Sequence, residues 1–146
     1  MYKIKIKTTW ADCDANAHVK NTAFSEFATH CRLSFFEAKG FPPKKLAKHQ
    51  IGPVIMREEV LFFREVSMME MVEISYALQA STADYSKFSF LHQVFKENGK
   101  KAAQLTVEGL WLDLNLRKAT IPPDFLQKIC AEMPKTANFE WLKGRK

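Results

Sequence analysis

The sequence predicts an α+β fold in which one long central helix is wrapped by a curved antiparallel sheet of about five strands. Apolar residues at helical spacing follow residue 21, and several later segments alternate apolar and polar residues as strands do. No internal repeat or linker-like segment interrupts this order. We therefore expect residues 1–146 to form a single domain, with a core at about 2–122 and a C-terminal helix and tail at 123–146.

The composition narrows the class of partner. Hydrophobic residues make up 47% of the chain and charged residues 26%, ordinary values for a globular protein. The formal net charge of +6 favours anionic partners, but the basic residues are dispersed along the chain. A nucleic-acid-binding domain needs a clustered basic stripe, so we expect no nucleic-acid partner. No apolar run approaches the roughly 18 residues that a membrane span needs, so we expect no membrane-spanning segment.

Two features bear on the compartment. The segment from Met1 to Lys7 alternates charged and apolar residues and lacks the apolar stretch of a signal peptide. The three cysteines, Cys13, Cys31 and Cys130, are odd in number and form no C-x-x-C pair, which favours reduced thiols. We therefore expect a cytoplasmic protein.

The first strand and the helix have clear limits in the sequence. Residues 2–9 alternate apolar and basic side chains, which predicts a strand with one wet face. From Asn21, the predicted N-cap, the period becomes helical, and the helix should end at Gly40 before two prolines. The residues expected on the buried face are Phe24, Phe27, Ala28, Cys31 and Phe35, with Leu33 and Phe36 widening it.

Four strands are predicted after a possible short helix at 44–49. They cover residues 53–65, 71–80, 87–96 and 101–114. The alternating apolar residues expected to face inward are Val72, Ile74, Tyr76, Leu78, Phe88, Phe90, His92, Val94, Ala103, Leu105, Val107 and Trp111. Asn98-Gly99 predicts a hairpin between the last two strands. Pro122-Pro123 should open a C-terminal helix through Cys130, and the tail from Pro134 is assigned no structure.

A polar block stands between the first strand and the helix. Residues 12–21 read Asp-Cys-Asp-Ala-Asn-Ala-His-Val-Lys-Asn. The block resembles the D-x-D-x-x-x-x-V motif of the 4-hydroxybenzoyl-CoA thioesterase-like family. It also resembles the corresponding motif of acyl-acyl-carrier-protein thioesterases, and Arg32 and Asp113-Leu114 near Arg117 extend the similarity over about residues 3–122. The resemblance implies the hotdog fold and an acyl-CoA thioesterase that needs no cofactor.

The resemblance also implies roles for individual residues. Asp14 matches the family's catalytic carboxylate, which acts as nucleophile on the thioester or as general base for water. Asn21 lies where the family uses a backbone N–H at the start of the helix to polarise the thioester carbonyl. Asn16 and His18 match residues that orient the acid or the water. Two positions depart from the family, because Thr29 replaces a frequent Glu and Phe24 a frequent Tyr.

The same residues, and the cysteine and histidines near them, also have structural or metal-binding roles to compare. Asp12 is assigned to a turn, as Asp14 would be if it stood alone. The set Asp12, Asp14 and His18 matches a closed metal site poorly, so we expect no metal. Cys13 lies between two aspartates, which disfavours a reactive thiolate. The histidines without a nearby acidic partner in sequence, His30, His49 and His92, are assigned structural roles.

The expected reaction is hydrolysis of an acyl-CoA to a free acid and CoA. By resemblance we expect a homodimer or homotetramer with its site between subunits. No motif identifies the groups that would meet the CoA phosphates, and Arg57 and Arg64 are trial positions only. The alternatives are an acyl-acyl-carrier-protein thioesterase, a hotdog dehydratase or hydratase using a His and carboxylate pair, and a non-catalytic acyl-CoA-binding module.

Overall fold

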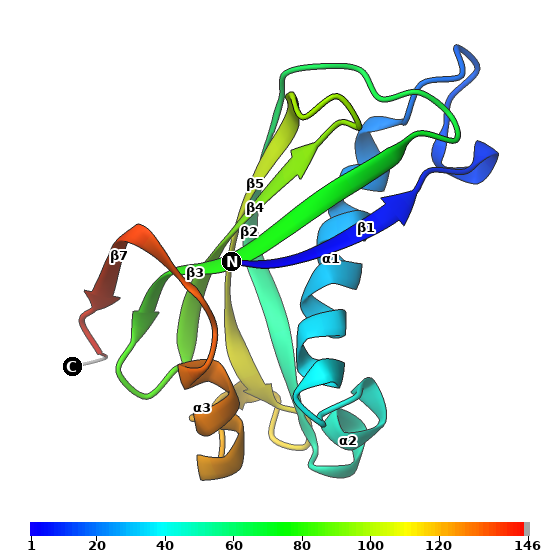
Figure 1. Cartoon of the computed structure of the whole chain (residues 1–146). Helices are drawn as coiled ribbons and strands as arrows, with labels where there is room; N and C mark the ends of the chain where they lie inside the picture. Colours follow the sequence, from blue (N-terminus) through cyan, green and yellow to red (C-terminus); the bar gives the residue numbers. More distant parts are fainter. Residues whose placement is uncertain (145–146) are drawn as a thin grey trace.

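The computed structural model describes residues 1–144 as one long helix packed against a curved, mainly antiparallel sheet (Figure 1). The helical elements are a 3₁₀ turn at Trp10–Asp12, α1 at Asn21–Ala38, α2 at Pro43–Lys48 and α3 at Asp124–Ala131. The strands are β1 (Tyr2–Lys7), β2 (Ile51–Phe62), β3 (Met71–Thr82), β4 (Lys87–Phe95), β5 (Lys101–Asp113), β6 (Lys118–Ala119) and β7 (Lys135–Leu142). This is the hotdog arrangement.

The sheet has the order β1-β3-β4-β5-β2, and every neighbouring pair on that path is antiparallel. The short strand β6 adds to β5, and β7 adds to β3 in parallel, so seven strands form one sheet. The five strands of the main path are those that the sequence predicts, with limits that differ by up to three residues. The long helix α1 lies along the curved face (Figure 1).

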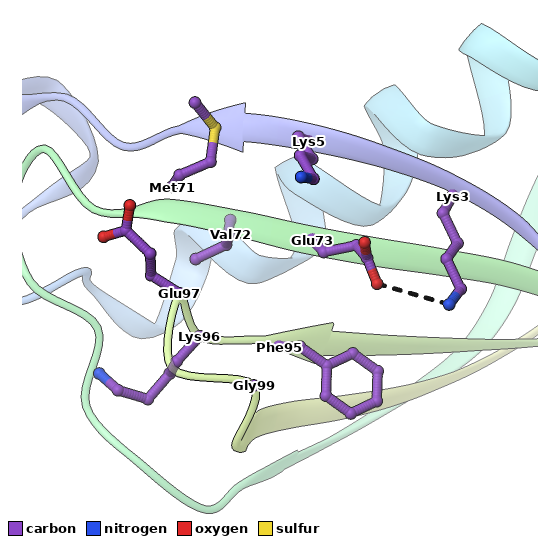
Figure 2. Close-up of a pocket in the computed structure, with 9 residues that line it drawn as sticks. All are labelled: Lys3, Lys5, Met71, Val72, Glu73, Phe95, Lys96, Glu97 and Gly99. Carbon is purple, nitrogen blue, oxygen red and sulfur yellow. Dashed lines mark ion pairs between the residues drawn. The ribbon is translucent and has the colours of Figure 1, made fainter.

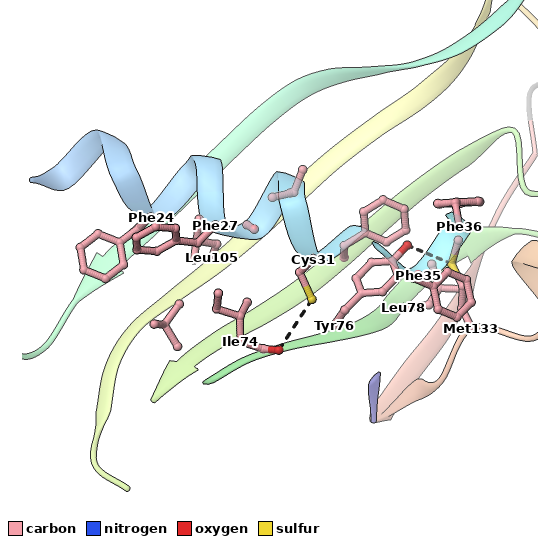
Figure 3. Close-up of a cluster of buried hydrophobic side chains, with 14 of the residues drawn as sticks. Phe24, Phe27, Cys31, Phe35, Phe36, Ile74, Tyr76, Leu78, Leu105 and Met133 are labelled. Atoms are coloured by element: carbon pink, nitrogen blue, oxygen red, sulfur yellow. Dashed lines mark hydrogen bonds between the residues drawn. The ribbon is translucent and has the colours of Figure 1, made fainter. Parts of the chain in front are cut away.

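The buried face of α1 follows the predicted apolar stripe closely. Its buried residues are Ala23, Phe24, Phe27, Ala28, Cys31, Arg32, Phe35 and Phe36. Figure 3 shows Cys31, Phe35 and Phe36 of this face beside Ile74, Tyr76 and Leu78 of β3. The Cys31 thiol donates to the Ile74 carbonyl, and the Tyr76 hydroxyl donates to Met133 Sδ. The prediction for Leu33 was wrong, because this side chain is 36% exposed and does not widen the buried face.

Both ends of α1 can be compared with their predicted caps. The prediction of Asn21 as N-cap was wrong by one position, because Lys20 is the extended capping residue and Asn21 is already helical. At the other end Gly40 takes φ +80°, as predicted for a residue just after a helix. The N–H of Gly40 donates to Glu37 and that of Phe41 to Phe36, which is the Schellman pattern. The pattern turns Phe41 back against the core.

The predicted inward faces of β3, β4 and β5 are confirmed. Each of the twelve residues named for these faces is buried, including His92. Residues 96–100 join β4 to β5, and Gly99 has φ +84° there, as the predicted hairpin requires. Within β2 the register with β5 shifts between Ile55 and Arg57, which is a β-bulge.

The strand β7 was not predicted. The short strand β1 pairs with Met71–Tyr76 of β3 and leaves the rest of that edge free. The parallel strand β7 covers the remainder, from Leu78 to Thr82. An uncovered edge would expose unpaired backbone groups, so β7 completes the edge that β1 is too short to cover.

Candidate active site

The predicted site residues lie in a loop that folds back on itself before α1. The Lys20 N–H donates to the Asp12 carbonyl, and the Asp14 N–H donates to the His18 carbonyl, at 2.8 and 2.9 Å. The loop also docks on the segment after β2, since the Val19 N–H donates to Val66 and the Met68 N–H to Ala17. Asp14 is therefore held on a backbone frame directly ahead of the helix.

The carboxylate of Asp14 is held through one oxygen. Its Oδ1 accepts hydrogen bonds from the backbone N–H groups of Asn16 and His18, at 2.9 and 3.4 Å. Within residues 1–144, Oδ2 has no hydrogen-bond donor, and the residue is exposed. One oxygen thus fixes the orientation and the other is free to meet a substrate or a water molecule.

The structure does not join all four predicted residues in one network. His18 Nε2 lies 3.3 Å from Glu65 Oε2, whereas within residues 1–144 the hydrogen bonds between His18 and Asp14 use only backbone groups of His18. The Asn16 side chain is exposed, and it is the Asn16 backbone that contacts Asp14. The sequence indicated a His and carboxylate pair as an alternative but did not identify Glu65 as the partner.

The start of α1 offers unpaired donors next to this loop. The Lys20 carbonyl accepts from Ala23, whereas the backbone N–H groups of Asn21 and Thr22 have no acceptor among residues 1–144. Such N–H groups carry partial positive charge and suit an oxyanion. Asn21 lines a shallow pocket of about 330 Å³ with Phe24, Phe62 and Arg64. Asp14 is outside the lining but in the loop that leads into it.

The neighbouring thiol is not arranged as a nucleophile. Desolvation raises the pKa of Cys13, and the charges of Asp12 and Asp14 raise it further. Residues 1–144 contain no group of three or more His, Cys, Asp and Glu side chains placed to hold a metal ion. None of the helices in the described part of the chain is long and apolar enough to cross a membrane.

A second depression lies on the outer side of β1 and β3. It measures about 400 Å³ and is lined by charged residues, among them Lys3, Lys5 and Glu73 (Figure 2). Lys3 and Glu73 form an ion pair at 3.5 Å, so part of the charge is already compensated. Of the two trial arginines, Arg57 contacts Glu59 and Glu108, whereas Arg64 lines the pocket at Asn21.

A third cavity lies beside the middle of α1, and the sequence did not indicate it. It measures about 210 Å³ and has mostly apolar walls, including Phe36, Phe88, Phe90 and Trp111. Among the residues that the structure describes, Arg32 is the one charged residue in its lining, and it is only 9% exposed. The departure at Thr29, which also lines the cavity, was the only signal in the sequence for an unusual environment around Arg32.

The guanidinium of Arg32 is held by neutral partners. Its Nη1 contacts His92 Nε2 at 3.0 Å, and its Nη2 donates to Thr29 Oγ1 at 3.0 Å. His92 Nδ1 lies 3.0 Å from the Ser75 carbonyl, so Nδ1 carries the proton and Nε2 accepts from Arg32. Desolvation and the charge of Arg32 lower the pKa of His92 to about 3, so His92 is neutral near pH 7.

The fold and the loop ahead of α1 together define a hotdog protein with a candidate thioester site. The sequence profile of the thioesterase-like superfamily matches residues 8–129. The chain therefore belongs to the thioesterase-like superfamily. A search of curated protein sequences gave no match.

Solved structures share the fold at low sequence identity. A hypothetical protein of Staphylococcus aureus in complex with CoA is 15% identical, with TM-score 0.82, covering 92% of this chain and 86% of that one. A 1,4-dihydroxy-2-naphthoyl-CoA thioesterase from Synechocystis is 13% identical, with TM-score 0.81 and coverages of 90% and 96%. The gentisyl-coenzyme A thioesterase BH1999 is 18% identical, with TM-score 0.75 and coverages of 86% and 98%. These likenesses concern the fold.

Proposed function

We propose that the chain hydrolyses an acyl-CoA thioester to a free acid and CoA, with Asp14 as the catalytic carboxylate. The observation that carries this proposal is the geometry of Asp14. One carboxylate oxygen is fixed by two backbone N–H groups, and the other is free, in a loop that leads into the start of α1. Membership of the thioesterase-like superfamily supports the reaction class.

In this mechanism the free oxygen of Asp14 attacks the thioester carbonyl or removes a proton from an attacking water. The carbonyl oxygen gains negative charge as the tetrahedral intermediate forms. The unpaired N–H groups of Asn21 and Thr22 are suited to stabilise that charge. The C–S bond then breaks and the thiolate of CoA takes up a proton. If water attacked, this step gives the free acid directly; if Asp14 attacked, it leaves a mixed anhydride on Asp14, which water hydrolyses to release the acid and restore the carboxylate. Asn16 and His18 are proposed to position Asp14 and the water.

The carrier is proposed to be CoA. One of the structural relatives was solved in complex with CoA, and two others act on aromatic acyl-CoA substrates by their names. Arg64 is exposed and lines the pocket at Asn21, and the only partner of its side chain among residues 1–144 is the Lys101 carbonyl, which supports a role in meeting an anionic group of the carrier. Arg57 is less suited, because two glutamates already contact it.

The site is proposed to be completed in a homodimer or homotetramer. β2 is at the end of the sheet order and pairs only with β5 among residues 1–144. Large apolar side chains on and after this edge are exposed, including Met56 at 68%, Phe62 at 53% and Phe63 at 50%. Apolar surface beside an open strand edge favours pairing with a second copy. Light scattering after size exclusion would detect the dimer or tetramer, and a monomer would contradict this part.

The reaction is tested by thiol release from short, medium, long and aromatic acyl-CoAs. The purified chain should release CoA from at least one of them, and Asp14→Asn should not. A single turnover in ¹⁸O-water, followed by mass spectrometry of the peptide that carries Asp14, would separate the two roles. Label in Asp14 identifies a nucleophile. Because water can also open a mixed anhydride at the acyl carbonyl, a general base is identified only when neither label nor an acylated Asp14 peptide is found after rapid quenching. No thiol release from any substrate would refute the proposal.

A second candidate function is the hydration or dehydration of an acyl thioester. The contact between His18 and Glu65 favours it, because a His and carboxylate pair can serve as acid and base. Glu65→Gln separates the two candidates. A hydratase should lose activity on enoyl-CoA, measured by absorbance, whereas a thioesterase that depends on Asp14 should keep most of its thiol release.

A further inference from the structure

We infer that the cavity beside Arg32 binds an apolar group that ends in a carboxylate. If the proposed function holds, this group is the far end of the acyl chain, and the substrate is the mono-CoA thioester of a dicarboxylic acid. The inference rests on the acyl-CoA proposal only for that second step. The binding of the carboxylate itself can be measured without any turnover.

The first argument is the charge of Arg32. Buried charges in proteins are normally paired, since removing a charge from water without a partner is costly. Arg32 is 9% exposed, and no carboxylate of residues 1–144 lies within ion-pair distance of it. His92 cannot help, because it is neutral and serves only as an acceptor. The guanidinium therefore lacks a counter-ion of its own.

The second argument is the supply of free donors. A guanidinium has five N–H groups. His92 and Thr29 accept from two of these, so three remain. Among residues 1–144, the nitrogen Nε has no acceptor. In the same range, Thr136 Oγ1 is the only side-chain nitrogen or oxygen that is both fully covered and without a partner, so Nε is not fully covered. Nε therefore keeps open surface, and Arg32 lines the cavity into which it can face. Planar N–H pairs of this kind match a carboxylate.

The third argument is the size and polarity of the cavity. Its walls include Phe36, Phe88, Phe90 and Trp111, all at most 9% exposed, and the more exposed Leu33 and Ile55 also line it. A volume of 210 Å³ exceeds the roughly 150 Å³ that admits benzene in an engineered cavity. A single ring or a short aliphatic chain therefore fits, with its charged end at Arg32.

The charge balance selects the anion. Arg32 supplies one positive charge in an apolar setting, which a carboxylate neutralises. A phosphate would leave about one further negative charge uncompensated, so the CoA phosphates are unsuited to this cavity. A competing acid is Glu58 of β2, whose charge acts on Arg32 and whose carboxylate accepts from the Ser25 hydroxyl.

The position along α1 fits the far end of an acyl group. Asn21 and Arg32 are eleven residues apart, which corresponds to about 16 Å along a helix. Both cavities are lined by β2, one through Phe62 at the end of the strand and the other through Ile55, seven residues earlier. A thioester at the start of α1 would therefore direct its acyl chain along the contact of α1 with β2 toward Arg32. The Ser25 to Glu58 hydrogen bond crosses this path.

The test uses ¹⁹F NMR titration of the full chain with 4-fluorobenzoate and with its neutral analogue 4-fluorobenzamide. The acid should bind at least about tenfold more tightly than the amide, because charged hydrogen bonds are worth about a factor of ten or more. Equal binding of the two probes, or binding of neither, would overturn the inference.

Two variants sharpen the test. Thr29→Glu places a carboxylate beside Arg32 at an exposed position of α1, so the fold should tolerate it, and circular dichroism would verify this. It should reduce acid binding to the level of the amide. Glu58→Gln removes the competing acid and should leave binding equal or tighter. Undiminished acid binding in Thr29→Glu would contradict the inference.

Arg64→Gln is the matched control, because Arg64 is the arginine of the other aromatic pocket. It should leave acid binding unchanged, and a loss in this variant alone would place the anion there and overturn the inference. Thiol release from carboxylate-ended and neutral acyl-CoAs separates this inference from the proposed function. Acid binding without any hydrolysis would contradict only the proposed thioesterase function. Hydrolysis without selective acid binding would contradict only the inferred carboxylate site at Arg32.

Discussion

The two ends of the path along α1 are built on opposite principles. Around Asp14 the groups are exposed, and the backbone of a short loop holds them through local hydrogen bonds. Around Arg32 the groups are buried, and side chains of α1 and β4 and a backbone carbonyl of β3, all distant in sequence, hold one another. A loop of the first kind leaves a motif in the sequence. A cavity of the second kind depends on the tertiary structure.

The largest effect should fall at the loop end. Asp14→Asn removes the charge while keeping an oxygen for the hydrogen bonds from Asn16 and His18. Thiol release should fall by about 10²–10⁴-fold, the usual range for a catalytic acid or base. Asp12→Asn is the matched control, because Asp12 Oδ2 only accepts from Thr9 and an amide oxygen can replace it. Equal losses in both variants would mean that the loop frame matters and the Asp14 charge does not.

At the cavity end the largest effect should come from Gly109→Ala. A Cβ at this position would lie 2.2 Å from the Val54 carbonyl oxygen and 2.8 Å from the Phe88 ring, which lines the cavity. The free energy of unfolding, measured in urea, should fall by at least about 2 kcal/mol. In Gly52→Ala the nearest atom is 3.6 Å away, so that control should change by less than about 1 kcal/mol. Similar values for both would contradict the close approach.

The buried pair of Arg32 and His92 predicts a dependence of stability on pH. In the unfolded chain the imidazole takes up a proton near pH 6.5, but in the fold the lowered pKa of about 3 keeps it neutral. The contribution of neutral His92 to the free energy of unfolding is therefore fully present above pH 6.5. It decreases as the pH falls toward 3, by up to about 1.4 kcal/mol per pH unit. Urea unfolding at pH 7, 6 and 5 should give a smaller slope for His92→Gln. An unchanged slope would show that other groups cause it.

The smallest effect is expected at the C-terminal end of α1. Gly40→Ala has room for its Cβ, since no atom lies within 4 Å, but φ +80° is strained for alanine. Stability should fall by about 1 kcal/mol, and Phe41, which lines the Arg32 cavity, could shift with it. Thermal unfolding measures the loss. A gain in stability would show that the turn does not hold this conformation.

Periodicity predicted the parts of the fold in which one face is buried. The stripe of α1 and the alternation of β3, β4 and β5 were read correctly because each buried residue recurs at a fixed spacing. β7 was missed because Thr136 is its only buried residue, so it shows no alternation. Leu33 was misplaced because an apolar residue beside the stripe can remain exposed.

The candidate residues divide in the same way. The block at 12–21 is contiguous, so its resemblance to a thioesterase motif could be recognised, and the proposed role of Asp14 still awaits measurement. His92 was assigned a structural role correctly as a buried residue, but its contact with Arg32 joins positions sixty residues apart. Only the packing of α1 against the sheet brings these two side chains together. Glu65 was missed for the same reason, because its contact with His18 depends on how two loops dock.

The division of one edge of β3 between β1 and β7 has a consequence for the order of folding. β1 precedes β3 and can pair as soon as β3 is made, whereas Lys135–Leu142 follows β3 by more than fifty residues. The half of β3 from Leu78 to Thr82 therefore keeps an open edge during synthesis, until β7 has been made. That open edge is where intermediates of this protein should associate with one another, and where a chaperone would bind.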